Sequence, residues 1–149
     1  MVTNSAIDQP HIIHVLVEYA IKIHKRDPYL TVNISGNKAG LIELANALMQ
    51  ANGDTYAILS GTPKALHPYT DYASGIRIIK RNSLLVMMLE DNILTFFGTE
   101  IVLKTLQDFV QNLVETTVNV IGQHIHVEYY DEHPYISPFC DVSLVIEII

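Results

Sequence analysis

The sequence predicts a single α+β domain over residues 1–149, built from a twisted antiparallel sheet with two helices on one face. Several stretches alternate apolar and polar residues, which is typical of half-buried strands, and two others carry apolar residues at helical spacing. The order strand, strand, helix, strand, strand occurs twice, in residues of about 11–81 and 82–149. We interpret the repetition as two ββαββ halves related by duplication. Tight hairpins between consecutive strands favour antiparallel pairing.

The first half is predicted to hold four strands and one helix. The helix is indicated by leucines at helical spacing after a Ser-Gly-Asn break, and Ser35 or Asn37 is its N-cap. Pro28 suits the turn between the first two strands, because its φ is fixed. A long loop over 61–74 separates the last two strands. In chain order the elements are 15–24, 29–34, the helix around 41–48, 55–60 and 76–80.

The second half repeats this order. A tight turn at 90–92 joins its first two strands, and its helix opens at Gly98. Treating Gly36 and Gly98 as equivalent also aligns Leu41 with Leu103, and the long loop of each half contains His-Pro-Tyr. The uncovered face of the sheet is expected to meet water or a docking partner. The elements are 84–89, 93–97, the helix from 99, 123–129 and 142–148.

Charge is distributed unevenly along the chain, whose formal net charge is −7. Residues up to Arg81 carry an excess of two positive charges, whereas after Arg81 ten acids face the single base Lys104. An acidic half argues against nucleic-acid binding, because phosphate contacts need a basic surface. It favours a basic protein partner, whose approach it accelerates. Ordinary solubility charge is the alternative.

The two long loops are the predicted interaction sites. Loops of this length inside a compact domain are usually functional, and tyrosine is a good interface anchor because its ring is apolar and its tip polar. The alternative is that these aromatic rings fold back over the core or a sheet edge. The predicted partner-binding residues are Tyr69, Asp71, Tyr72, Glu128, Tyr129, Tyr130, Asp131, Glu132, Tyr135 and Asp141.

The strand around 124–128 offers a second possibility, a metal site. Side chains alternate along a strand, so His124, His126 and Glu128 share one face, and His133 is close in sequence. Two imidazoles and a carboxylate can bind zinc. A solvent-facing polar row explains the same pattern, and no second ligand pair or cysteine partner accompanies it. We therefore predict no metal or other cofactor and keep a small metal-binding protein or metal-dependent enzyme as the alternative.

Catalytic, secretory and membrane signals are lacking. Cys140 is the single cysteine and has no basic sequence neighbour that would activate it, and no GxSxG motif is present. A lone cysteine and a start without a basic, apolar leader predict a protein of the reducing cytoplasm. The densest apolar run is too short to cross a membrane. We predict no catalytic residues and no enzyme activity.

Three segments resemble one family of bacterial immunity proteins, which protect producers against polymorphic or contact-dependent toxins. They read LTVNISGNKAGL at 30–41, HIHVE at 124–128 and LVIE at 144–147. The resemblance implies a cytosolic, non-enzymatic inhibitor that binds its cognate toxin domain directly, and a basic nuclease would suit the acidic half. A third alternative is an assembly subunit, or homodimer, in which strands rich in Ile and Val such as 144–149 pair between chains.

Overall fold

The computed structural model of the chain describes residues 11–24, 27–50, 53–61, 69–116 and 122–149. Its elements in chain order are β1 (His11–Ile13), β2 (Leu16–His24), β3 (Asp27–Gly36), α2 (Lys38–Met49), β4 (Asp54–Leu59), β5 (Asp71–Tyr72), β6 (Gly75–Lys80), β7 (Val86–Glu90), β8 (Ile93–Gly98), α3 (Glu100–Thr116), β9 (His124–Val127) and β10 (Val142–Ile148). The predicted strands and both helices are present, and β1 and β5 are additional short strands.

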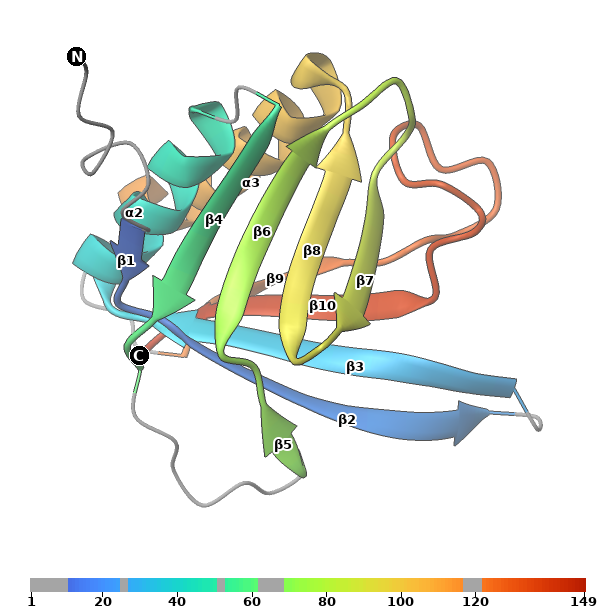
Figure 1. Cartoon of the computed structure of the whole chain (residues 1–149), viewed down its shortest axis with the longest axis horizontal. Helices are drawn as coiled ribbons and strands as arrows, with labels where there is room; N and C mark the ends of the chain where they lie inside the picture. Colours follow the sequence, from blue (N-terminus) through green and yellow to red (C-terminus); the bar gives the residue numbers. More distant parts are fainter. Residues whose placement is uncertain (1–10, 25–26, 51–52, 62–68, 117–121) are drawn as a thin grey trace, which may run out of the picture.

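The strands form two mixed sheets of five strands each. Sheet A has the order β1-β4-β6-β8-β7, and sheet B has the order β5-β2-β3-β10-β9. Figure 1 shows α2 and α3 behind sheet A, with the strands of sheet B running across its lower end. The helices contact each other and both sheets, α2 through β1 and β3 and α3 through β8 and β9. The α+β class is confirmed, with two mixed sheets in place of one antiparallel sheet.

Long-range parallel pairs account for this difference. The hairpins β2–β3 and β7–β8 are antiparallel as predicted, and Asp91 and Asn92 close the second one with φ values of 53° and 62°. Positive φ at both turn positions is the geometry of a two-residue hairpin. In contrast, β3 pairs in parallel with β10, and β6 in parallel with β8. Local sequence reveals a hairpin, but it carries no mark of a partner strand a hundred residues away.

The two sheets have matching topologies. Strands β2, β3, β10 and β9 of sheet B correspond in order and in pairing direction to β7, β8, β6 and β4 of sheet A. The registers also match, because Gly36 pairs with Ile148 and Gly98 pairs with Lys80. Each sheet thus combines the first hairpin of one predicted half with the second hairpin of the other. Duplication of the chain stays a prediction, which this topology supports.

One buried cluster joins the two sheets and the helices. Its centre is formed by fully buried side chains of both sheets: Val32 and Ile34 on β3, Leu144 on β10 and Leu94 on β8. The buried stripes of both helices belong to the same cluster. The helices begin alike. The side chain of Asn37 accepts a hydrogen bond from the Gly40 N–H at 2.9 Å, and Thr99 Oγ1 accepts one from Val102 at 3.2 Å. Asn37 is therefore the N-cap of α2.

No helix among the described residues is both long enough and apolar enough to span a membrane.

Candidate functional site

The segment between β9 and β10, residues 128–141, is held against the protein body by aromatic contacts. The Tyr135 ring is half-buried and lies 5.8 Å from the Phe109 ring of α3, centroid to centroid. His133 lies between two tyrosines, with ring centroids 4.4 Å from Tyr130 and 4.5 Å from Tyr135. Edge-on ring contacts of this kind are favourable. These contacts give the segment a defined shape.

His133 also supports the backbone of this segment. Its Nδ1 accepts hydrogen bonds from the N–H groups of Tyr135 at 3.2 Å and Ile136 at 3.1 Å. Nδ1 can accept both only when it carries no proton. Burial lowers the pKa of His133, which favours this neutral form. His133 is thus a structural residue of the segment.

Four carboxylates of this segment are exposed. Glu128 accepts a hydrogen bond from the Ser143 hydroxyl at 2.8 Å, which orients it along the outer face of sheet B. Asp131 and Glu132 lie in the turn that follows, and Glu132 has a φ of 63°. Asp141 is fixed through its backbone, because its C=O accepts from the Leu30 N–H at 3.2 Å. We refer to Glu128, Asp131, Glu132 and Asp141 as the acidic rim.

An apolar groove of about 350 Å³ adjoins the acidic rim at Asp141. It lies where the β2–β3 hairpin passes the edge strand β7, and Figure 1 shows this hairpin extending beyond β7. A smaller cavity of about 190 Å³ continues from it and contains Glu128. Both share Tyr29, Asp141 and Val142, so Asp141 stands between them. The lining of the groove is Ile21, Tyr29, Leu30, Met88, Leu89, Asp141 and Val142.

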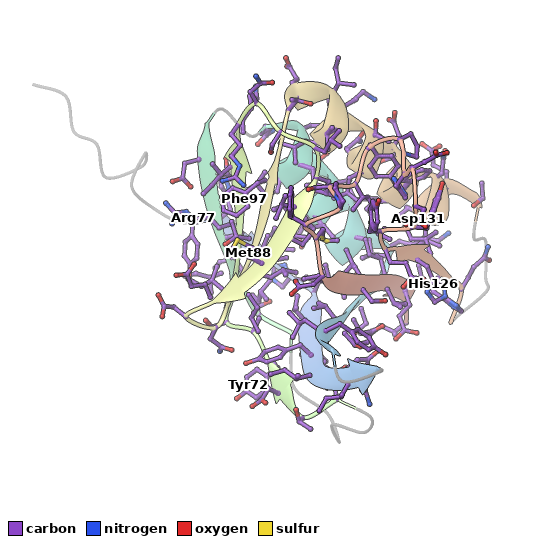
Figure 2. All side chains as sticks on the ribbon, turned by 90° about the vertical axis from the view of Figure 1, so that its right-hand side faces the viewer. Tyr72, Arg77, Met88, Phe97, His126 and Asp131 are labelled. Carbon is purple, nitrogen blue, oxygen red and sulfur yellow. The ribbon has the colours of Figure 1, made fainter. Side chains whose placement is uncertain are left out.

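The second predicted loop lies elsewhere. Asp71 and Tyr72 form β5, which pairs with β2 at the edge of sheet B opposite to β9. Figure 2 shows Tyr72 well separated from Asp131. Burial raises the pKa of Tyr69, and so do the nearby charges of Glu147 and Glu18. The structure therefore does not bring Tyr69, Asp71 and Tyr72 together with the acidic rim. Residues 62–68 of this loop lie outside the described residues.

The candidate metal ligands do not converge. The rings of His124 and His126 lie 5.0 Å apart edge to face on β9, while Glu128 binds the Ser143 hydroxyl and His133 is held by backbone amides. In the part of the chain that the structure describes, no three His, Cys, Asp or Glu side chains are grouped as a metal would require. The pattern on β9 fits an exposed polar row, with Ile125 half-buried and Val127 buried on the other face.

Cys140 is buried beside the smaller cavity. Burial raises the pKa of its thiol, although backbone N–H groups of Val142 and Met87 hydrogen-bond the sulfur and lower it in part. A thiol with a raised pKa is a poor nucleophile at neutral pH. Its surroundings give Cys140 a packing role.

The outer face of sheet A is a feature that the sequence analysis did not identify. Neither of the described helices α2 and α3 covers it, and Tyr56, Ile58 and Met88 are exposed there. The Arg81 guanidinium lies 4.0 Å from the centre of the Phe97 ring. Figure 2 places Met88 and Phe97 on the side opposite to Asp131. The sequence signal for this exposed apolar face was that these strands carry apolar residues at both alternating positions, and not at one only.

The third alternative, in which residues 144–149 pair between chains, needs these residues to form a free edge strand, and they do not. Residues 144–148 belong to β10, which is paired on both sides, in parallel with β3 and antiparallel with β9. A strand with two neighbours has no free backbone groups to offer to another chain. The edge that adjoins the groove belongs to β7, the last strand of sheet A.

The model of one protein family matches the sequence of this chain over much of its length. The family is described as Immunity protein 32, and its model matches residues 31–57 and 93–148, more than half of the chain. The chain belongs to this family. The predicted resemblance to immunity proteins of toxin systems is thereby confirmed. The match covers both helices, β9, β10 and the whole acidic rim, whereas residues 1–30 and 58–92 lie outside it. None of the curated proteins and none of the solved structures compared with this immunity protein matches it.

Proposed function

We propose that this immunity protein neutralises its cognate toxin by direct binding, and that the acidic rim and the adjoining groove form the docking surface. The observation that carries the proposal is that Asp141 lines the apolar groove and Glu128 lines the cavity that continues from it. Asp131 and Glu132 extend the exposed negative charge along the same segment, which His133 and Tyr135 hold in place. Rigid surfaces bind with a smaller entropic cost. Family membership supplies the toxin as partner.

Binding accounts for neutralisation without chemistry. The thiol of Cys140 is buried with a raised pKa, and the His133 ring nitrogen Nδ1 is occupied by two backbone amides. Neither group is available to a substrate. We propose an inhibitor that acts in the cytoplasm with no cofactor, no nucleic-acid ligand and no membrane attachment.

The charge of the rim favours a basic toxin surface. Complementary charge raises the rate of encounter, whereas buried aromatic anchors slow dissociation. Tyr130, which is 55% exposed next to Asp131, is the aromatic anchor of this surface. A nuclease, whose active site must attract phosphates, has the basic surface that such a rim fits.

The test measures the affinity of the purified immunity protein for the toxin domain encoded beside it, at two salt concentrations. We expect the double variant Asp131→Asn with Glu132→Gln to bind at least about tenfold more weakly, mainly through slower association. The same double variant should protect a toxin-expressing cell less well. Unchanged affinity would exclude the acidic rim, and an absence of any complex would exclude direct binding.

The control removes the same number of charges elsewhere. Glu100 and Glu115, near the two ends of α3, are exposed acids outside the rim and outside the predicted partner-binding residues. The double variant Glu100→Gln with Glu115→Gln should keep the affinity of the unmodified protein. If both double variants lose affinity equally, the net charge of the protein matters and the rim has no special part.

A further inference from the structure

We propose, on the basis of the proposed function, that the toxin contributes an extended segment that adds to sheet A along β7. The segment would place an apolar side chain in the groove and a Lys or Arg side chain against Asp141. The proposal specifies the kind of toxin element bound, which the acidic rim alone does not define. It rests on the backbone of β7, the shape of the groove and the position of one carboxylate.

Among the described residues, only the first part of the outer edge of β7 is covered. Leu85, just before β7, forms a parallel bridge with Ile136, in which its N–H donates to Tyr135 and its C=O accepts from Ser137. Two residues further on, the Met87 N–H hydrogen-bonds the Cys140 sulfur. Residues 135–137 thus already lie along this edge as a short extended segment, and the turn over 137–140 then brings Cys140 beside Met87. The edge of β7 is therefore able to accept a neighbouring strand.

This cover ends before Leu89. In an edge strand, the backbone N–H and C=O groups of every second residue point away from the sheet. After Leu85 and Met87, the next residue whose backbone groups point outward is therefore Leu89. Among the described residues, the backbone of Leu89 has no hydrogen-bond partner on the side away from β8. The protein chain turns away at Asp141 to enter β10. Its departure leaves Leu89 facing the groove.

The groove follows the edge of the strand. Met88 and Leu89 are consecutive, so their side chains point to opposite faces of sheet A, yet both line the groove. A groove lined by both faces must run alongside the backbone between them. The opposite wall is formed by Ile21 and Leu30 of the β2–β3 hairpin. Ile21 is 71% exposed and offers apolar area to an incoming side chain.

The negative charge of Asp141 determines which toxin residue should stand next to the apolar one. Asp141 is exposed, lines the groove and lines the adjoining cavity that contains Glu128. Consecutive residues of an extended segment point in opposite directions about 3.3 Å apart, so one can enter the groove while its neighbour meets the rim. A carboxylate at this place binds a guanidinium or ammonium group best. Strand addition of this type combines backbone hydrogen bonds with pockets for alternate side chains.

The first test compares two substitutions at one position. Leu89→Pro removes the outward N–H, and a proline is tolerated on an edge strand where that N–H faces away from the sheet. Leu89→Ala removes the same leucine contacts but keeps the N–H. We expect Leu89→Pro to bind the toxin domain at least about tenfold more weakly than Leu89→Ala. Equal affinities of the two folded variants would overturn strand addition.

The second test needs no variant. Amide hydrogen exchange of the unmodified protein is measured with and without the toxin domain, and we expect the Leu89 N–H to exchange markedly more slowly in the complex. Amides of β1, at the other edge of sheet A, serve as the control and should be unchanged. A complex that weakens on neutralisation of the rim but leaves Leu89 exchange unchanged would overturn strand addition and retain the proposed function. Absence of a complex would overturn both.

Discussion

Gly40, in the first turn of α2, lies against the backbone of His14. A Cβ on Gly40 would be 2.2 Å from the carbonyl oxygen of His14 and 3.0 Å from its carbonyl carbon. Residue 40 is the third residue after the N-cap Asn37, and the third residue after the N-cap Thr99 of α3 is Val102. The two helix starts are otherwise alike, so the connection between β1 and β2 explains why glycine is needed only in α2.

Replacing Gly40 by alanine should destabilise the protein. Alanine favours a helix by about 1 kcal/mol over glycine. Here the added methyl group meets backbone atoms that cannot move aside, and overpacking costs about 1–3 kcal/mol or more. We expect Gly40→Ala to lower the free energy of unfolding by about 1–3 kcal/mol, measured by urea denaturation.

Ala39 provides the matched control, because it is the exposed neighbour of Gly40 in the same turn. Ala39→Gly should lower the free energy of unfolding by about 1 kcal/mol, as expected of helix propensity alone. If Gly40→Ala instead raised the stability by a similar amount, the close approach of His14 to α2 would be contradicted.

The Asn37 cap should contribute measurably to stability. Its side chain accepts from the Gly40 N–H at 2.9 Å, which satisfies one of the free amides at the start of α2. Asn37→Ala is expected to cost about 1 kcal/mol of unfolding free energy, whereas Asn37→Asp keeps an acceptor and should cost little. Equal losses for the two variants, measured by denaturation, would show that the cap bond is not the cause.

Acid should weaken the segment that carries the rim. Because burial holds the pKa of His133 below its ordinary value, the unfolded chain takes up a proton at this residue more readily than the folded protein does. His133 therefore contributes stability above the ordinary histidine pKa of about 6.5. That contribution is lost as the pH falls through the lowered pKa. We expect the free energy of unfolding to decrease between about pH 7 and pH 5.

His133→Asn tests this pH dependence, since asparagine offers a neutral acceptor at every pH. The variant should show a smaller decrease between pH 7 and pH 5 than the unmodified protein. His126→Asn is the matched control, because that ring is exposed on β9 and takes no part in the His133 contacts. A similar change in both variants would contradict a special role of His133.

Local sequence patterns predicted the helices and most strands, but they did not predict how the strands are arranged in two sheets. Alternation located β10, and the glycine breaks at Gly36 and Gly98 located both helix starts. Parallel pairs such as β3 with β10 depend on the packing of the whole core, so the arrangement in two sheets could not be read locally. The two-residue β5 is too short to produce a periodic pattern.

The candidate site was predictable only in part. Charge and tyrosine content pointed to residues 128–141, because charged residues are usually exposed and can be recognised from the sequence alone. The groove needs Met88 of sheet A and Ile21 of sheet B, which are brought together only by the crossing of the two sheets. The half-covered edge of β7 depends on the bridge between Leu85 and Ile136. Such features arise from tertiary contacts and have no local signature.

The thiol of Cys140 should react slowly in the folded protein. It is 6% exposed, and burial raises its pKa, so both access and thiolate content are low. We expect labelling by a disulfide reagent at pH 8 to be at least about tenfold slower than in denaturant, where the chain is open. The control is Asn82→Cys in a Cys140→Ala background, since residue 82 is exposed and should label rapidly without denaturant. Rapid labelling of Cys140 in the native protein would contradict its burial, and with it the packing of residues 135–140 along β7.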